Sequence, residues 1–214
     1  MMLEVKNGRL ERDGKMLFSN LSFIAREGET ICVSGPADSG KTLLLRSFLG
    51  FHPLDDGYLS VDGELVHVAS APFFRKQMSY LPQDVDMPYQ KVSDMMEQLL
   101  SLKRDVTLEE SKTSLMALWK ELGIDEDVYT MEMAEISVHQ RRLLMLTGIC
   151  VLHRPIVLLD EPTTGMVSNE LDNVGHCLRY MAREGACIIV TCREHDAVIR
   201  YCDKLLELNT HLYS

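Results

Sequence analysis

Residues Gly35 to Thr42 read GPADSGKT, and this octapeptide constrains the fold more than any other part of the chain. It satisfies the pattern G-x-x-x-x-G-K-[ST] and follows the apolar run Thr30 to Ser34. A leucine-rich stretch that begins at Leu43 comes directly after it. A strand, a glycine-framed loop and a helix in this order are the context in which the pattern forms a phosphate-binding loop. The sequence therefore predicts a site for a nucleoside triphosphate.

The residue types of this loop match the chemistry that a triphosphate needs. Backbone N–H groups of the loop and of the following helix N-terminus converge on the β-phosphate. Glycines let the main chain turn tightly and approach the phosphates without a Cβ. We expect Lys41 to reach the β- and γ-phosphates and the hydroxyl of Thr42 to ligate Mg²⁺. The predicted nucleotide contacts are Gly35, Pro36, Ala37, Asp38, Ser39, Gly40, Lys41, Thr42 and Leu43.

A second constellation lies at the end of the apolar run Ile156 to Leu159, which is followed by Asp160 and Glu161. We expect this strand to lie beside the phosphate-loop strand in a parallel sheet, so that its C-terminal acids reach the phosphates. Asp160 is then placed to hold Mg²⁺ through water. Glu161 is placed to polarise a water in line with the γ-phosphate.

Composition narrows the class of protein. The chain has 214 residues, of which 46% are hydrophobic, enough for one globular domain or one domain with a small lobe. Its net charge of −10 argues against nucleic acid as the main partner. The six cysteines form no C-x-x-C pair, so we expect reduced core thiols of a cytosolic protein. Glu4 and Lys6 interrupt the first apolar residues, so no N-terminal signal is expected. No run approaches the roughly 20 apolar residues of a membrane span.

Turn signals and apolar periodicity divide the chain into strands and helices. Asp13-Gly14 joins two antiparallel strands within residues 2–25, and further strands are expected over residues 30–34, 58–61, 64–68, 78–81, 156–159, 186–191 and 204–208. Helices are expected over residues 41–50, 73–77, 92–103, 107–122, 138–152, 169–184 and 194–201. Thr107 and Glu110 have the spacing of a capping box.

These elements predict an α/β fold. Most of the expected strands lack a polar face of period two, which is typical of a parallel sheet covered on both sides. With the phosphate loop, the pattern predicts a P-loop NTPase whose mostly parallel sheet core carries an antiparallel β lobe and a helical insertion. We expect a single domain over residues 1–214, with the core and β lobe at residues 1–83 and 138–214. Residues 84–137 form the expected helical subdomain.

The order of four motifs resembles the ATP-binding subunit of ABC transporters over essentially the whole chain. The motifs are GPADSGKT, then SYLPQD around Gln83, then ISVHQRR at Ile136 to Arg142, then LLDEPTTG at Leu158 to Gly165. The resemblance implies that two such domains dimerise head to tail, as a homodimer or a heterodimer. Each ATP with its Mg²⁺ is then held between the phosphate loop of one subunit and the signature motif of the other, and closure moves a transmembrane permease subunit.

The resemblance also assigns roles to single residues. Lys41 and Thr42 bind phosphates and Mg²⁺, and Gln83 contacts Mg²⁺ and the attacking water. Asp160 is the metal-side aspartate, and Glu161 is the catalytic glutamate. The helical stretch after Gln83 docks on the membrane subunit. The implied location is cytoplasmic, at the inner face of the cell membrane, reached only through that partner.

The signature motif departs from the family pattern L-S-G-G-Q. Here Val138 and His139 replace both glycines, so two side chains stand where close backbone approach to the opposite ATP is wanted. Ser137 and Gln140 keep a capping arrangement and are the expected contacts to that ATP. For His139 we favour an ordinary surface histidine over a charged phosphate partner.

Further departures affect the loops around the nucleotide. Val167 replaces an aspartate of the dimer interface, and Cys192 takes the place of the histidine that hydrogen-bonds the γ-phosphate, although a thiol is a weak donor. His195 is a candidate to turn inward, but we favour a solvent-facing histidine. Asp38 stands where glycine is usual, and we expect it to adopt a left-handed conformation with its side chain toward solvent. Arg12 replaces the aromatic residue that stacks on the base, which leaves base selectivity open.

Two functions remain open from the sequence. The complete set of Lys41, Gln83, Asp160 and Glu161 favours an ATPase subunit that couples hydrolysis to transport. The altered signature, Val167 and Cys192 favour a regulatory or heterodimer partner that binds ATP and hydrolyses it slowly or not at all. A relative acting on DNA or ribosomes is disfavoured by the acidic charge.

Methionines are frequent in the predicted helical subdomain, and we favour core filling over an adaptable docking face for them. The residues concerned are Met87, Met95, Met96, Met116, Met131 and Met133. Trp119 is expected in the core.

Overall fold

The central sheet of the computed structural model, which describes residues 1–84, 88–103 and 106–208, is wholly parallel. Its order is β6-β7-β8-β3-β9. The strands are β6 (Met78–Leu81), β7 (Ile156–Asp160), β8 (Cys187–Cys192), β3 (Thr30–Ser34) and β9 (Lys204–Glu207). Every residue of β3, β7 and β8 is buried, as expected of strands covered on both faces. The predicted α/β core with a parallel sheet is confirmed.

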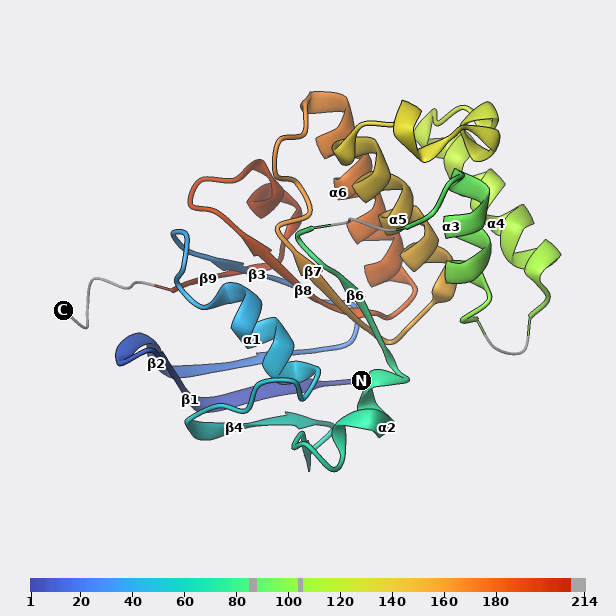
Figure 1. Ribbon diagram of the computed structural model, residues 1–214. Coiled ribbons are helices and arrows are strands. Elements are labelled where there is room, and N and C mark those ends of the chain that lie inside the picture. The colour runs from blue at the N-terminus through green and yellow to red at the C-terminus, as the bar shows by residue number, and fades with distance from the viewer. Residues whose placement is uncertain (85–87, 104–105, 209–214) are drawn as a thin grey trace.

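An antiparallel sheet of order β2-β1-β4-β5 forms the lower layer in Figure 1. Its strands are β1 (Leu3–Arg12), β2 (Lys15–Ala25), β4 (Asp56–Val61) and β5 (Glu64–Leu65). The turn between β1 and β2 is the predicted Asp13-Gly14 pair, with φ of 52° and 75°, values that this dipeptide tolerates in a tight hairpin. Helix α1 (Lys41–Phe48) lies between the two sheets, and its apolar side chains share one core with both. The predicted antiparallel lobe is therefore confirmed.

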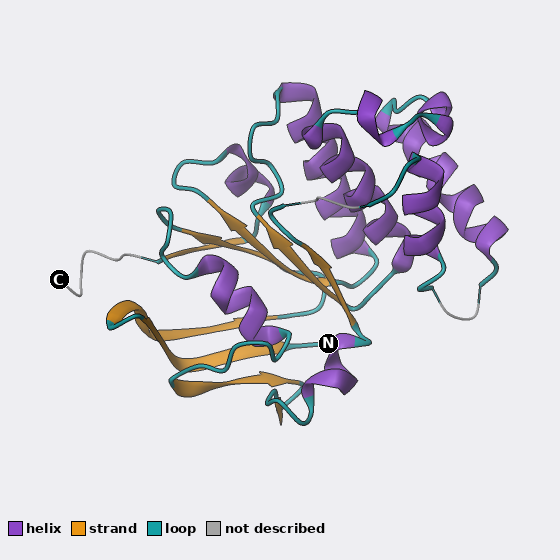
Figure 2. Cartoon of the chain, in the orientation of Figure 1, coloured by secondary structure: helices purple, strands orange, loops and turns teal. Residues whose placement is uncertain are grey.

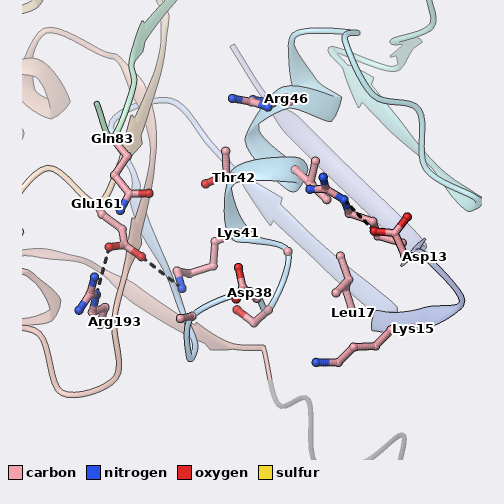
Figure 3. Close-up of a pocket in the computed structure, with 15 residues that line it drawn as sticks. Asp13, Lys15, Leu17, Asp38, Lys41, Thr42, Arg46, Gln83, Glu161 and Arg193 are labelled. Carbon is pink, nitrogen blue, oxygen red and sulfur yellow. Dashed lines mark hydrogen bonds and ion pairs between the residues drawn. The ribbon is translucent and has the colours of Figure 1, made fainter. Parts of the chain in front are cut away.

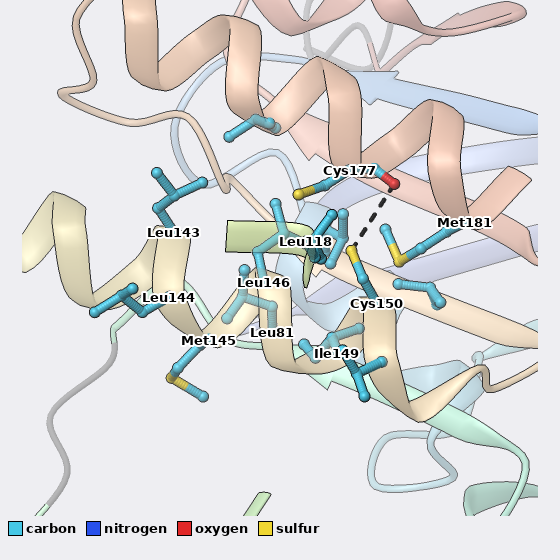
Figure 4. Close-up of a cluster of buried hydrophobic side chains, with 14 of the residues drawn as sticks. Leu81, Leu118, Leu143, Leu144, Met145, Leu146, Ile149, Cys150, Cys177 and Met181 are labelled. Atoms are coloured by element: carbon cyan, nitrogen blue, oxygen red, sulfur yellow. Dashed lines mark hydrogen bonds between the residues drawn. The ribbon is translucent and has the colours of Figure 1, made fainter. Parts of the chain in front are cut away.

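The other helices cover the opposite face of the parallel sheet or extend from it (Figure 2). They are α3 (Val92–Leu100), α4 (Leu108–Leu122), α5 (Val138–Leu152) and α6 (Ser168–Arg183), with α2 (Ala71–Arg75) beside the antiparallel lobe and short 3₁₀ helices η1 (Glu126–Thr130), η2 (Met133–Glu135) and η3 (Ala197–Tyr201). Thr107 caps α4 as predicted, because its Oγ1 accepts from the Glu110 N–H at 3.2 Å. Figure 4 shows side chains of α5 packed against Cys177 and Met181 of α6.

Four element predictions are wrong in extent or type. The helix expected over residues 92–103 is α3, which ends at Leu100. The strand expected over residues 64–68 stops at Leu65, because His67 and Ser70 bond each other in a turn, with His67 N to Ser70 Oγ at 3.0 Å. The helix expected over residues 73–77 is α2, two residues earlier. The helix expected over residues 194–201 is only η3, since His195 has a left-handed φ of 61° and Asp196 caps the segment.

The placement of β7 also differs from expectation. The strand that carries Asp160 does not pair with the phosphate-loop strand β3, because β8 lies between them. All three strands are parallel, so their C-terminal ends still lie along one edge of the sheet. The acids Asp160 and Glu161 therefore still lie at the same edge of the sheet as the phosphate loop, as predicted, with Thr191 of β8 paired opposite Asp160.

The helical segment around α4 packs around Trp119, which is fully buried. Its indole Nε1–H donates to Thr147 Oγ1 of α5 at 2.8 Å, and its ring meets Tyr129 edge to face at 6.2 Å. The methionines of this segment face the same core: Met95, Met96 and Met133 are buried, and Met116 and Met131 pack against them. The core-filling interpretation is confirmed for these five, whereas Met87 lies outside the described residues.

We expect Trp119→Phe to lower the free energy of unfolding by about 1–3 kcal/mol, because it removes a buried hydrogen bond and leaves Thr147 without its indole donor. Urea unfolding followed by circular dichroism measures this, since Trp119 is the sole tryptophan and its fluorescence is lost in the variant. Leu65→Ala, at a side chain that is 51% exposed, is the control. A change below about 0.5 kcal/mol for Trp119→Phe would contradict the interpretation.

Candidate nucleotide-binding site

A cavity of about 680 Å³ opens where the phosphate loop, the C-terminal end of the parallel sheet and the hairpin of the antiparallel sheet meet (Figure 3). It is lined by Arg12, Asp13, Lys15, Leu17, Ala37, Asp38, Ser39, Gly40, Lys41, Thr42, Leu43, Arg46, Gln83, Glu161 and Arg193. The structure thus brings together most of the residues predicted to bind nucleotide. Gly35 and Pro36 lie behind the lining, where their carbonyls contact Lys41.

The loop backbone requires its glycines. Gly40, the residue before α1, has φ of 92°, and a Cβ on Gly35 would lie 2.8 Å from Ser39 Oγ. Asp38 has a left-handed φ of 59° and is exposed, as predicted for an aspartate in a glycine position. The residue before α1 is Gly40, which has no side chain to cap the helix, and the first residues of α1 line the cavity, so their N–H groups are accessible from it. This is the arrangement that binds phosphate.

Lys41 is folded back onto its own loop. Its Nζ donates to the carbonyl oxygens of Gly35 at 2.8 Å and Pro36 at 2.7 Å, and it lies 3.3 Å from Glu161 Oε1. The side chain of Lys41 is only 5% exposed, so water screens its positive charge little and an anion in the loop would interact with it strongly. Nearby, Ser39 Oγ is buried and has no hydrogen-bond partner among the described residues. An unpaired hydroxyl beside a buried ammonium fits a phosphate group, because a phosphate oxygen would accept from both.

Glu161 is fixed by its backbone and its carboxylate. Its N–H donates to Thr191 O at 3.1 Å and Thr191 Oγ1 at 3.0 Å, which holds a left-handed φ of 45°. Such a conformation costs on the order of 1–3 kcal/mol and is concentrated at functional sites. The carboxylate is nearly buried and meets Lys41 and Arg193 at 3.3 Å each, while Thr164 Oγ1 donates to it at 3.2 Å. The predicted acid therefore lies beside the phosphate loop.

Asp160 and Gln83 occupy different depths. Asp160 is 1% exposed and does not line the cavity; its Oδ1 accepts from Thr191 Oγ1 at 2.7 Å and its Oδ2 from the Tyr80 hydroxyl at 3.3 Å. Burial, together with this carboxylate, raises the pKa of Tyr80 to about 12, so the phenol stays a donor. Gln83 lines the cavity, and Arg142 Nη2 donates to its carbonyl at 2.6 Å. Thr42 and Gln83 can thus face a Mg²⁺ ion directly, with Asp160 behind them, which suits contact through water.

Cys192 is not where the sequence analysis expected it. Its side chain is fully buried and does not line the cavity; its Sγ lies 2.8 Å from Cys32 Sγ in the core. Successive side chains of a strand point to opposite faces. Val190 and Cys192 share the face toward α5 and α6, so Thr191 lies on the other face, where its Oγ1 bonds Asp160, and Arg193, one residue beyond the strand, lines the cavity.

Sequence reasoning missed Arg193, and the alternation along residues 187–192 was the signal that could have found it. It also missed Lys15, Leu17 and Arg46, which line the cavity from β2 and α1. Arg12, which was predicted, lies in the lining at the hairpin, with Nε 3.5 Å from Asp13 Oδ2.

The signature residues lie outside this cavity. Ser137 and Gln140 form the predicted capping box at the start of α5, with Gln140 N to Ser137 Oγ at 3.1 Å, and both are exposed. His139 is not an ordinary surface residue: a Cβ on Gly165 would lie 2.4 Å from its ring, and its buried Nδ1 lacks a partner among the described residues. His195 is exposed and does not line the cavity, so the solvent-facing interpretation holds.

No helix in the described parts of the chain is long and apolar enough to cross a membrane. The same residues contain no cluster of three or more His, Cys, Asp or Glu side chains arranged to hold a metal. A Mg²⁺ ion beside a nucleotide is usually held by phosphate oxygens, waters and one or two carboxylates, and Thr42, Gln83 and Asp160 are the side chains here that fit this role.

Comparisons with known proteins identify a family for the chain. The family model described as ABC transporter matches residues 18–164. The chain is similar to the cytochrome c biogenesis ATP-binding export protein CcmA of Chelativorans sp., with 33% identity over 78% of each chain, and to that of Hahella chejuensis, with 29% identity over 89% of this chain and 88% of the relative. A putative ABC transporter ATP-binding protein from Pyrococcus furiosus has the same fold, with a TM-score of 0.81 at 20% identity over the whole of both chains. The chain therefore belongs to the ABC transporter family, as an ATP-binding subunit and ATPase.

Proposed function

We propose that this subunit binds Mg·ATP in the cavity around Lys41, dimerises through its signature face, and couples ATP turnover to a transmembrane permease. One observation carries the proposal: the phosphate-loop ammonium of Lys41 and the carboxylate of Glu161 lie 3.3 Å apart at the rim of one cavity. A cation for the phosphates and a base for water are thus already adjacent. Mg²⁺, held by Thr42 and Gln83 with Asp160 behind them, supplies neutralisation of phosphate charge when bound.

The residues of the chain divide the work of hydrolysis. Lys41 exchanges its loop carbonyls for the β- and γ-phosphates, and Ser39 donates its free hydroxyl to a phosphate oxygen. Glu161 accepts a proton from the attacking water, and Gln83 orients that water. Each of these residues lines the cavity, which supports a turning-over ATPase over the hydrolysis-impaired alternative.

The signature face is the proposed dimer interface. Ser137 and Gln140 are exposed, do not line their own cavity and stand at the N-terminus of α5, so they are accessible to the ATP of a second subunit. Val138 and Val167 are 52% and 64% exposed, which is unusual for valine and fits a surface that a partner covers. A bacterial ABC transporter cassette of the same fold, with a TM-score of 0.81 at 19% identity, has been solved as a dimer.

The proposed dock for the permease is a groove of about 530 Å³ at the base of the helical segment. Its apolar lining includes Leu99 and Leu102 from and after α3, and Met145 and Ile149 from α5. Its basic residues are Arg75, Lys76 and Arg154. In a chain of net charge −10 this local excess of positive charge fits an amphipathic helix with acidic residues, contributed by the membrane subunit. This proposal puts residues 84–137, with α3 among them, in a docking subdomain, and puts the protein at the cytoplasmic face of the cell membrane.

Leu102→Asp is expected to weaken association with the permease at least about tenfold, because it removes an apolar contact and places a negative charge that repels the acidic residues of the docking helix and competes with them for the basic groove residues. Co-purification with the proposed transmembrane permease, and stimulation of phosphate release by it, measure the effect. Leu102 is 54% exposed, so the variant folds; Leu65→Asp, at a 51% exposed leucine of the other lobe, is the matched control. Equal co-purification of the two variants would refute the proposed dock, and no association of the unaltered chain would refute the coupling.

A further inference from the structure

Arg193 is a cation in the nucleotide cavity that none of the expected roles covers. It follows the last residue of β8, and its Nε lies 3.3 Å from Glu161 Oε2 (Figure 3). Among the described residues, Glu161 is the one side chain that the guanidinium contacts. The catalytic carboxylate is therefore held between two cations, the loop ammonium on one oxygen and the guanidinium on the other.

The side chain of Arg193 is poised to change partner. It is 61% exposed, whereas the carboxylate of Glu161 is only 8% exposed. Its backbone, by contrast, is fixed: Ser34 Oγ and Asp196 N–H both donate to its carbonyl oxygen, at 3.4 Å and 3.2 Å. A guanidinium on a fixed backbone, with a solvent-accessible head beside a phosphate site, can rotate to a new anion without unfolding anything. Arginine suits this role because its planar fork pairs with carboxylate and phosphate alike.

The position of Glu161 indicates where the γ-phosphate of a bound ATP would lie. If Glu161 activates the attacking water, the γ-phosphate lies next to it and therefore next to Arg193. A γ-phosphate would also bring negative charge against a nearly buried carboxylate, and a cation between the two offsets that repulsion. ADP has no phosphate at this place and leaves the pair of Arg193 with Glu161 undisturbed.

We propose that Arg193 is the side chain by which this subunit distinguishes ATP from ADP. When ATP binds, the guanidinium of Arg193 moves from the carboxylate of Glu161 to the γ-phosphate. The inference rests on the proposed function, because it needs the phosphates to occupy the cavity in the order that Lys41 and Glu161 imply. When the guanidinium leaves Glu161, it also frees that carboxylate to accept a proton from the attacking water. Recognition of ATP and activation of the water are therefore linked through the contact between Arg193 and Glu161.

Calorimetric titration of the full chain with Mg²⁺ and either ADP or the non-hydrolysable imido analogue of ATP tests the proposal. Arg193→Ala is expected to reduce the preference for the triphosphate over ADP by about 10- to 100-fold, the value of a hydrogen bond to a charged group, while ADP affinity is unchanged. Arg193→Lys keeps the charge without the fork and is expected to restore part of the preference. Arg200→Ala is the matched control. Arg200 lies in η3, the segment after Arg193, and its exposed guanidinium pairs with Asp172 of α6, so the variant removes the same charge away from the cavity.

Each outcome decides. A preference that is unchanged in Arg193→Ala overturns the inference, as does an equal loss of affinity for both nucleotides, which would indicate only a general electrostatic effect. If Arg200→Ala reduces the preference for the triphosphate over ADP as much as Arg193→Ala does, the inference is also overturned. If the unaltered chain binds neither nucleotide, the proposed function itself fails, and that result is distinguishable because it does not depend on the variant.

Discussion

Glu161→Gln is expected to lower the rate of ATP turnover by about 10²–10⁴-fold, the contribution typical of a positioned general base. Glutamine has nearly the shape of glutamate, so it fits the same space beside Lys41 and Thr164, but its amide does not take a proton from water. Release of inorganic phosphate at saturating Mg·ATP, by the subunit alone and with the proposed permease, measures the rate.

The control for this variant is Glu64→Gln, which removes the same charge from an exposed residue of β5. Binding of ATP should survive in Glu161→Gln, because the phosphate contacts of Lys41 and Ser39 are intact. A loss of rate without a loss of binding would identify Glu161 as the base. Equal turnover in the unaltered chain and in Glu161→Gln would instead support the hydrolysis-impaired alternative that the altered signature motif raised.

The local features of this site were predictable because short segments carry them. The phosphate loop, its helix and the acid-tipped strand each depend on a run of neighbouring residues, and the structure has all three. Asp38 also behaved as predicted, since its left-handed φ of 59° is a property of that residue type.

The errors came from relations between distant segments. The insertion of β8 between β3 and β7 is a matter of sheet order, which no single segment encodes. His139 was misjudged because its neighbour Gly165 belongs to another loop, whose missing side chain makes room for the imidazole ring.

The misplacement of Cys192 has a more instructive cause. Matching a motif fixes a residue by its place along the chain, whereas a strand fixes a side chain by the parity of its position. A shift of one residue moves a side chain from the cavity to the core, as the pair Cys192 and Arg193 demonstrates. The sequence therefore located the functional segment correctly and assigned the wrong side chain of that segment to the cavity.

Lys41→Met is expected to weaken the binding of Mg·ATP by about 2–5 kcal/mol, at least about 30-fold, because it leaves phosphate charge in the loop without its buried partner. Methionine keeps the length and the apolar stem of lysine, so the packing of α1 between the sheets is preserved. Calorimetric titration with Mg²⁺ and the imido analogue of ATP measures the change. Lys6→Met, at an exposed residue of β1, is the control for charge and size.

The stability of Lys41→Met separates two explanations of that loss. In the structure Lys41 donates to two loop carbonyls and pairs with Glu161, so its removal takes away contacts of the empty loop as well as contacts to nucleotide. If the ammonium mainly holds the loop, the variant should unfold at lower urea concentration, and Glu161 should still pair with Arg193. If it mainly serves the phosphates, stability should change little while affinity collapses. We expect the second result, because backbone hydrogen bonds also hold the loop, from Gly35 N–H to Cys192 O at 3.3 Å and from Leu44 N–H to Gly40 O at 2.8 Å. The buried ammonium contacts only two carbonyls and one carboxylate, and a phosphate is a stronger partner for it.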